Sequence, residues 1–281
     1  MSFVSPMMAK VLPEDFDGAP GGNWIAEEKF DGHRIVVSVE DRAADLFGGR
    51  AVTAWSRYGI ERSLPPHIRD AFQELPTGTY DGELLVPGER SYGTVVLENS
   101  PKLVYVVFDV ICLMGKDLTI GGLQVPWTER RGYLAEIFRK TTGSHPVHLA
   151  HVTDLTDRAQ VGHLAKEVWD RDGEGLILKN VASLYCPGKR PKNAWYKIKQ
   201  LRSAVLTVVG FREGTMGPNS VVVLRDDDGV ETTVKWKNYE WLDKLQADPK
   251  SFMGRKLRIE FQEKTADGSY RHPRWDRWED E

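Results

Sequence analysis

Cysteine is scarce in this sequence, which has two among its 281 residues. Cys112 and Cys186 are too few for a disulfide framework or a four-cysteine zinc site. Long apolar runs are missing as well, since no stretch approaches the roughly 20 residues needed to span a bilayer. The first residues also lack the basic start and apolar stretch of a secretory signal. We therefore expect an intracellular protein that does not bind a membrane, and not a small secreted scaffold.

A strong net charge is absent too, because 38 basic and 41 acidic residues leave a net charge of −3. The charges are nevertheless unevenly distributed. Residues 171–202 include eight basic side chains and two acidic ones. Such a segment can bind nucleic acid or a polyphosphate, although a solvated surface gives the same pattern. The net charge therefore does not exclude a nucleic-acid partner.

The first 200 residues contain several strand patterns. Two predicted strands, 24–28 and 34–39, flank Asp31-Gly32, a dipeptide typical of a hairpin turn. Further strands are predicted at 51–56, 79–86, 103–111, 175–179 and 194–199. The segment 103–111 is almost continuously apolar, which favours a central position in its sheet.

Helical spacing of apolar residues predicts helices at 128–140, with Thr128 as its cap, and at 156–170. After Gln200 the pattern changes to short strands separated by turns. These strands are predicted at 204–211, 220–225, 230–236 and 256–262, with one short helix near 238–246. A compact run of short strands suggests a small barrel. We therefore predict an α+β chain whose domain boundary lies near 200–203.

The segment E-E-K-F-D-G-H-R at 27–34 is the first candidate for chemistry. Lys29 comes at the end of a predicted strand, beside acidic residues and a tight turn, where its side chain can project into a cleft. A lysine becomes a nucleophile when its pKa is lowered or its proton is removed. The K-x-D-G pattern is short and fits an ordinary surface hairpin equally well. The assignment of Lys29 therefore depends on other segments.

Isolated carboxylates are the second candidate feature. Strand alternation in 79–86 puts Asp81 and Glu83 on one face and Leu84 on the other. A carboxylate on an otherwise apolar strand needs a cation or a hydroxyl partner. Glu174 similarly stands at the head of the apolar strand 175–179. Two such carboxylates could hold a hard divalent ion through oxygen.

Paired lysines complete the set. Lys197 and Lys199 are two residues apart and therefore share one face of their strand. Like charges side by side are unfavourable unless an anion neutralises them, which a polyphosphate would do. A nucleophilic lysine, isolated carboxylates and paired lysines together are the groups that a nucleotidyl transfer site needs.

In their order along the chain, these segments resemble those of the covalent nucleotidyltransferase superfamily, and within it the ATP-dependent DNA ligases of phage and bacterial type. The matching segments are E-E-K-F-D-G-H-R at 27–34, S-R-Y-G-I-E at 56–61, Y-D-G-E-L-L at 80–85, V-V-F-D-V at 106–110, E-G-L-I-L-K at 174–179 and W-Y-K-I-K at 195–199. The tail T-A-D-G-S-Y-R-H-P-R-W at 265–275 is similar to the end of the ligase OB domain. Each segment alone is a weak signal, and their common order is a strong one.

The resemblance implies a fold. Residues 1–200 would form an adenylation (nucleotidyltransferase) domain of ATP-grasp-like type, with antiparallel sheets and flanking helices. Residues 201–281 would form a C-terminal OB-fold β-barrel. One departure concerns the tail, where many relatives have a basic R-x-D-K element that orients pyrophosphate. Here the tail ends in acidic residues, which leaves open which of its arginines takes that role.

The resemblance also implies roles for individual residues. Lys29 is the catalytic residue and carries AMP as a phosphoramidate. The nucleotide-binding residues are Glu27, Arg34, Glu83, Phe108, Lys179, Lys197 and Lys199, with Glu27 beside the adenine and Phe108 stacked on it. Glu83 and Glu174 are the metal ligands. Arg34 and Arg57 contact the DNA, and Arg57 meets the 5′-phosphate of the nick.

The implied activity is ATP-dependent DNA ligation with Mg²⁺, acting on nicked double-stranded DNA in the cytoplasm of a bacterial or phage-infected cell. We expect a monomer, with a repair or replication protein as a partner. ATP is favoured over NAD⁺ because few residues precede Lys29 and two cysteines cannot build a zinc module. Two alternatives remain open: an RNA ligase or GTP-dependent capping-type enzyme, and a catalytically silent nucleic-acid-binding module.

Overall fold

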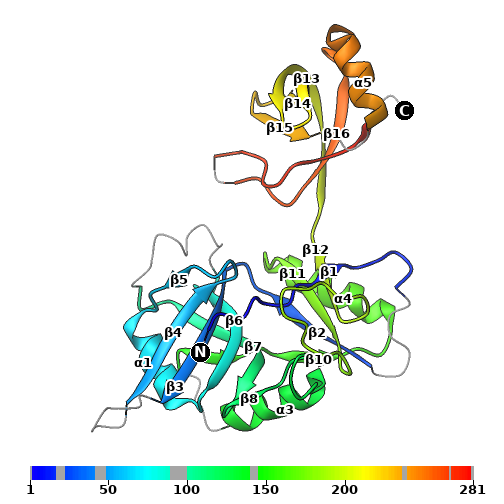
Figure 1. Ribbon diagram of the computed structural model, residues 1–281. Helices are drawn as coiled ribbons and strands as arrows, with labels where there is room; N and C mark the ends of the chain where they lie inside the picture. The colour runs from blue at the N-terminus through cyan, green and yellow to red at the C-terminus, as the bar shows by residue number, and fades with distance from the viewer. Residues whose placement is uncertain are drawn as a thin grey trace. The chain divides into compact units, whose positions relative to one another are not determined.

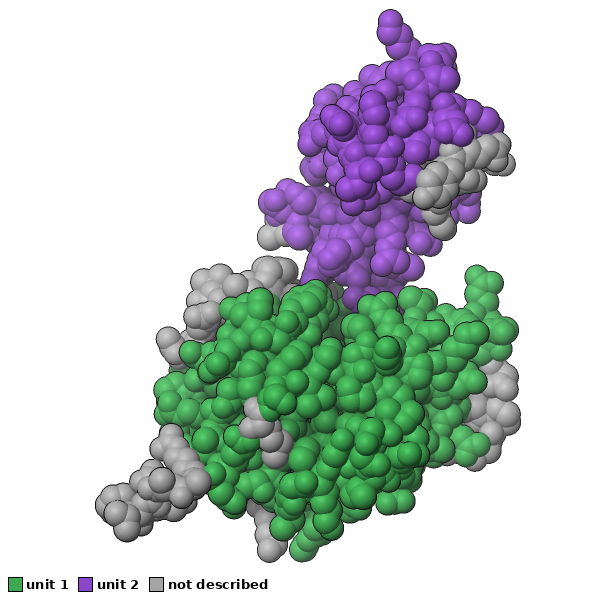
Figure 2. Space-filling model, viewed as in Figure 1, with its two compact units in different colours: residues 1–198 green, residues 199–281 purple. Residues whose placement is uncertain are grey.

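The computed structural model describes residues 2–16, 23–41, 49–88, 100–139, 145–235, 239–265 and 267–279 (Figure 1). The chain divides into two compact units, residues 1–198 and residues 199–281 (Figure 2). Both units combine sheets with a few helices, as expected for an α+β protein. No helix within the described ranges is long and apolar enough to cross a membrane.

The described part of unit 1 contains two sheets. The larger has the order β5 (Glu61–Arg62), β4 (Arg50–Ser56), β3 (His33–Asp41), β6 (Gly78–Leu85), β7 (Val104–Leu113) and β8 (Lys116–Asp117), with β9 (Val147–Leu149) also paired to β7. The smaller has the order β1 (Lys10–Val11), β12 (Trp195–Lys199), β11 (Gly175–Asn180), β2 (Trp24–Lys29) and β10 (Val152–Asp154). β1 runs parallel to β12 and β9 runs parallel to β7, whereas β2 runs antiparallel to β10 and β11, and the strands of the larger sheet from β5 to β8 run antiparallel to their neighbours. The apolar strand 103–111 is therefore interior, as predicted.

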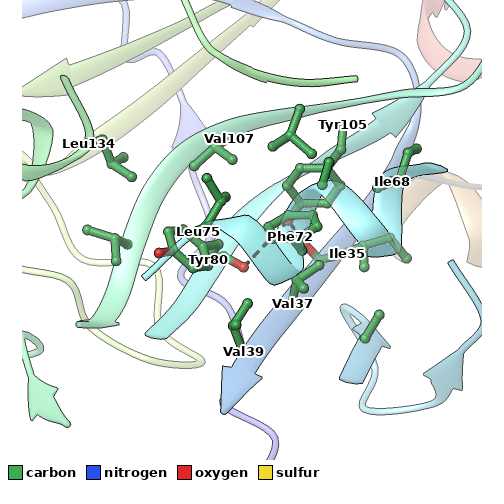
Figure 3. Close-up of a cluster of buried hydrophobic side chains, with 14 of the residues drawn as sticks. Ile35, Val37, Val39, Ile68, Phe72, Leu75, Tyr80, Tyr105, Val107 and Leu134 are labelled. Atoms are coloured by element: carbon green, nitrogen blue, oxygen red, sulfur yellow. Dashed lines mark hydrogen bonds between the residues drawn. The ribbon is translucent and has the colours of Figure 1, made fainter. Parts of the chain in front are cut away.

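Helices cover the outer face of each sheet in unit 1. Two of them, α1 (Pro66–Glu74) and α3 (Trp127–Phe138), pack on the larger sheet through one buried cluster. Phe72 of α1 lies in this cluster with its ring 5.8 Å from that of Tyr80 and 5.0 Å from that of Tyr105 (Figure 3). Helix α4 (Arg158–Asp170) packs on the smaller sheet.

Each sheet of unit 1 has one face covered by helices, and its other face points into a layer between the two sheets. On β2, β11 and β12, the side chains that pack toward α4 are Trp24, Ala26, Leu176, Leu178, Tyr196 and Ile198. On the larger sheet, Ile35, Tyr80 and Val107 pack toward α1 and α3. The residues between them in each strand therefore face the opposite way. Both sheets contribute to an internal cluster, in which Val36 and Ile111 meet Trp195.

Unit 2 is built on a single five-stranded sheet. Its order is β15 (Glu231–Lys235), β14 (Gly217–Arg225), β13 (Arg202–Gly214), β16 (Lys256–Phe261) and β17 (Arg274–Trp278). The edge strands β15 and β17 contact each other, so the sheet curls round its apolar core. Helix α5 (Tyr239–Ala247) and a 3₁₀ turn, Pro249–Phe252, supply further core residues.

The hairpin predicted at Asp31-Gly32 is wrong. The two strands exist, but β2 belongs to the smaller sheet and β3 to the larger one. Residues 30–32 therefore link two sheets. Gly32 is needed for close packing, because a Cβ there would lie 2.5 Å from the carbonyl oxygen of Leu84. A dipeptide that favours a turn cannot reveal that β2 pairs instead with β11, far along the chain.

Two other local predictions also need correction. Thr128 does not cap α3, because the helix begins at Trp127 after Pro126 and has no side-chain cap. Helix α1 was not among the predicted elements, although Pro66 near its start is favourable there. The short strands β1, β5, β8, β9, β10 and β17 were not predicted either. The predicted ends at 140, 236 and 238 lie outside the described residues.

Candidate active site

The lysine predicted as nucleophile is the last residue of β2. Its register partner on β11 is Gly175, so the preceding residue, Glu174, lies directly beside Lys29. Lys29 Nζ donates to Glu174 Oε2 at 2.5 Å. The side chain of Lys29 is 23% exposed, and that of Glu174 is 11% exposed. The ammonium is therefore held in place and still accessible to a ligand.

Glu83 approaches Lys29 and Glu174 from the larger sheet. It is half-buried on β6, across from Arg34 of β3. Burial raises the pKa of Glu83 to about 7; Lys29 and Arg34 oppose this rise, whereas Glu174 reinforces it. Glu83, Lys29 and Glu174 are therefore close enough to interact electrostatically, although Glu83 is on β6 of the larger sheet, Lys29 ends β2 of the smaller one and Glu174 directly precedes β11.

Glu27 and Lys179 form a buried ion pair in the layer between the sheets. Their charged atoms are 2.7 Å apart, and the two side chains are 3% and 1% exposed. Burial raises the pKa of Glu27 and lowers the pKa of Lys179. Lys179 Nζ also donates to the backbone oxygen of Phe108 at 2.8 Å and lies 4.4 Å from the Trp195 ring centre. Lys179 thus joins the smaller sheet to the larger one.

One of the two carboxylate oxygens of Glu27 has no hydrogen-bond partner among the described residues. This atom, Oε1, is buried. A buried acceptor without a partner is unfavourable by about 1–3 kcal/mol. A ligand that brings a hydrogen-bond donor to this point would remove that cost.

Arg34 lies on β3, on the face of the larger sheet that points toward the layer between the sheets. Its Nε and Nη2 atoms donate to the two oxygens of Asp81 at 2.9 and 2.6 Å. Asp81 is fully buried and also accepts from the Tyr185 hydroxyl at 2.6 Å. The sequence predicted that this carboxylate needs a cation or a hydroxyl partner, and it has both. The Arg34 guanidinium lies 5.2 Å from the centre of the Phe108 ring.

The structure brings most of the predicted site residues into this layer. Lys197 lies on the face of β12 opposite Tyr196 and Ile198, and Lys199 is the last residue of the same strand. Arg57 is not in the layer. It is exposed on the turn after β4, with its guanidinium 4.6 Å from the centre of the Tyr58 ring.

A second buried ion pair was missed by the sequence reasoning. Arg130 of α3 is fully buried and donates to both oxygens of Asp109 at 2.7 and 2.9 Å. Asp109 follows Phe108 on β7, so this pair anchors the strand beside the Phe108 ring. A lone acid in the apolar run 103–111 was the signal that could have predicted a buried cation partner.

The arrangement as a whole suits a negatively charged ligand with an aromatic part. It combines an accessible lysine, two nearby carboxylates, further cations from both sheets and an aromatic ring. Burial is the main reason for the raised pKa of Glu83, and the negative charge of Glu174 adds to the rise, so the two carboxylates repel each other. A divalent cation bound by oxygen ligands would relieve that repulsion, so the residues present fit Mg²⁺.

Comparison with known proteins identifies related sequences. A family model described as "ATP dependent DNA ligase domain" matches residues 6–199. The chain is 28% identical over 268 residues to a DNA ligase of Methanothrix thermoacetophila, covering 87% of this chain and 46% of that protein. It is 25% identical over 263 residues to a DNA ligase of Variola virus, covering 84% of this chain and 45% of that protein. The chain thus spans about half the length of these curated relatives.

The fold is also similar to solved structures. One comes from a structure–function study of DNA binding by Lig E DNA ligases, with a TM-score of 0.74, 18% identity and 98% of each chain covered. Another is the ATP-dependent DNA ligase of bacteriophage T7 in complex with ATP, with a TM-score of 0.53, 17% identity and 98% of each chain covered. These likenesses concern the fold. Since the family model covers more than half of the sequence, the chain belongs to the family of ATP-dependent DNA ligases.

Proposed function

We propose that this chain seals nicks in duplex DNA with ATP, through a covalent lysyl-AMP intermediate on Lys29. The observation that carries the proposal is the position of Lys29. It lies accessible at the end of β2, 2.5 Å from Glu174, and interacts electrostatically with Glu83 across the layer. Membership of the ATP-dependent DNA ligase family supports the same assignment.

In the proposed first step, Lys29 Nζ attacks the α-phosphorus of ATP. A nitrogen–phosphorus bond forms, and the bond to the leaving pyrophosphate breaks. The AMP group then passes to the 5′-phosphate of a nick, and the adjacent 3′-hydroxyl displaces AMP. The protein contributes positioning and neutralisation of charge, for which we propose Lys197 and Lys199 at the phosphates.

The base would lie against Phe108 and beside Glu27. Adenine presents an exocyclic amino group, a donor, where guanine presents a carbonyl oxygen, an acceptor. The unpartnered Oε1 of Glu27 can accept from the amino group, which favours ATP over GTP. Lys179 was predicted to bind the nucleotide. Because its side chain is 1% exposed, we propose that it holds Glu27 and Phe108 in position.

Mg²⁺ would be held by Glu83 and Glu174 together with phosphate oxygens of the substrate. Bound there, it would neutralise charge on the phosphates. Arg34 was predicted to meet the nucleotide or the DNA. Its bidentate pair with Asp81 leaves its face toward Phe108, which supports contact with the nucleotide.

DNA binding would involve Arg57 and unit 2. Arg57 is exposed on its turn, and a planar guanidinium can hold a phosphate through two hydrogen bonds. We propose that residues 1–200 are the adenylation domain and residues 201–281 an OB-fold domain. The curled sheet of unit 2, with β15 touching β17, supports the second assignment.

An RNA ligase or a capping-type enzyme is not favoured, because the matching family is that of DNA ligases. A silent binding module is not favoured either, since it would not need Lys29, Glu83 and Glu174 in one place. The test is incubation with Mg²⁺ and α-labelled ATP or GTP, followed by addition of a nicked DNA duplex. We expect label from ATP that survives denaturation and then sealing of the nick, with neither in Lys29→Ala. Equal labelling of Lys29→Ala would refute the proposed nucleophile.

A further inference from the structure

Tyr185 is a fully buried residue of the internal cluster to which both sheets contribute, together with Val36 and Trp195. Its hydroxyl donates to Asp81 Oδ2 at 2.6 Å and accepts from the backbone N–H of Met7 at 3.0 Å. Burial, together with the charge of Asp81, raises the pKa of Tyr185 well above its usual value. The hydroxyl therefore stays protonated and remains a donor to Asp81.

Asp81 connects the Tyr185 hydroxyl to Arg34 through hydrogen bonds. The oxygen that accepts from Tyr185 also accepts from Arg34 Nη2 at 2.6 Å. A carboxylate held at two points fixes the plane of the guanidinium that it binds. That guanidinium lies 5.2 Å from the Phe108 ring centre and 5.9 Å from that of Trp195. Along this route, Asp81 and Arg34 therefore lie between Tyr185 and the Phe108 ring.

The ring of Tyr185 acts on the same group of side chains by packing. It stands edge-on to the Trp195 ring, with ring centres 5.8 Å apart. Trp195 in turn stands edge-on to Phe108 at 6.5 Å. The Arg130 guanidinium lies 5.6 Å from the Tyr185 ring centre on another side. A phenylalanine would keep these ring contacts, so the hydroxyl can be tested separately from the packing.

We propose that Tyr185 is a positioning residue for nucleotide binding, which acts through Asp81 and Arg34 on the Phe108 ring. It touches none of the reacting atoms. The inference rests on the proposed function, because it takes Phe108 as the ring that stacks on the base. Without the hydroxyl, Asp81 keeps Arg34 as its partner, but the guanidinium and the ring beside it lose their fixed orientation.

The decisive variant is Tyr185→Phe, with Tyr80→Phe as the matched control. Tyr80 directly precedes Asp81 on β6, and its buried side chain points to the opposite face, where its hydroxyl donates to Pro76 O at 2.7 Å. Both variants remove one hydroxyl from a buried tyrosine. The measurements are the ATP concentration for half-maximal labelling of Lys29, the maximal labelled fraction, the calorimetric affinity for ATP and the melting temperature.

We expect Tyr185→Phe to raise the half-saturating ATP concentration and the dissociation constant by about three- to tenfold. The maximal labelled fraction and sealing by pre-adenylated protein should stay unchanged. Both variants should lower the melting temperature to a similar extent. Tyr80→Phe should leave the ATP dependence unchanged. An unchanged ATP dependence in Tyr185→Phe, or an equal rise in Tyr80→Phe, would overturn the inference.

A second comparison tests the route through Asp81. Asp81→Asn should weaken ATP binding, and adding Tyr185→Phe to it should weaken binding no further. Fully additive losses would mean that Tyr185 does not act through Asp81. If the wild-type protein binds ATP but takes no label, the proposed function fails while calorimetry still decides the role of Tyr185. If it does not bind ATP, both proposals fail.

Discussion

Lys29 Nζ and Glu174 Oε2 are 2.5 Å apart, although 145 positions separate the two residues in the chain. The contact is a consequence of strand register, because β2 ends at Lys29 opposite the first residue of β11. An oxygen that accepts from Lys29 is less available to a metal ion. We nevertheless expect Glu174 to serve both the nucleophile and the cation, since it has two carboxylate oxygens and Lys29 donates to Oε2.

Glu174→Gln preserves the size of this side chain and removes its charge. We expect self-adenylation with ATP to slow by roughly tenfold to a hundredfold, because a charge-assisted contact and a cation ligand are lost together. Labelling rates under single-turnover conditions measure the effect. Glu28→Gln is the matched control, since Glu28 directly precedes Lys29 on β2 and pairs with the exposed Arg171. Equal rates for wild type and Glu174→Gln would contradict the assigned role.

The buried pair of Glu27 and Lys179 gives a prediction about stability. Lys179→Met should lower the free energy of unfolding by about 3–5 kcal/mol, because it leaves Glu27 buried without its cation. Glu27→Gln should also destabilise, and the double variant should lose less than the sum of the two. Urea unfolding of the four proteins measures this coupling. Strict additivity would mean that the two side chains contribute independently.

The raised pKa of Glu83 predicts a dependence of stability on pH. In the folded protein the pKa of Glu83 is about 7, whereas the usual pKa of a glutamate side chain is 4.5. Between these values the unfolded chain ionises first, so stability falls as the pH rises. The loss amounts to about 3 kcal/mol at most. Glu83→Gln removes this loss of stability, because a glutamine side chain does not ionise.

In EDTA, Glu83→Gln should therefore melt at a higher temperature than wild type at pH 8 and gain much less at pH 5. Melting curves at both pH values provide the check. A gain of the same size at pH 5 and pH 8 would mean that Glu83 does not titrate in this range.

Arg57 and Lys197 should act at different steps. Arg57→Ala should label Lys29 at the normal rate and transfer AMP to a nick roughly tenfold to a hundredfold more slowly. Lys197→Ala should fail earlier, during self-adenylation or AMP transfer. Labelling rates and single-turnover sealing by pre-adenylated protein separate these effects. Slow labelling of Arg57→Ala, followed by normal sealing, would show that its assigned role is wrong.

Much of the site's layout could be predicted from sequence because its residues lie on half-buried strands. Period-two alternation in β6 put Asp81 and Glu83 on one face, and the need for a partner at Asp81 is met by Arg34 and Tyr185. Both inferences depend on local pattern and on the cost of burying charge.

What could not be predicted depends on pairing between distant segments. Asp31-Gly32 favours a hairpin locally, yet β2 gains its partners from β10 and β11. Tyr185 gives no sign in the sequence that its hydroxyl meets Asp81, because a tyrosine before Cys-Pro-Gly fits any loop. The pairing of Arg130 with Asp109 is equally non-local, since one residue is on a helix and the other on a strand.

The short link between β2 and β3 has a mechanical consequence. Lys29 belongs to one sheet and Arg34 to the other, and only five peptide steps connect them. A fully stretched chain of that length reaches about 17 Å. The link between β2 and β3 therefore has a fixed maximum length, which limits how far the two sheets can separate when a bulky substrate enters or leaves.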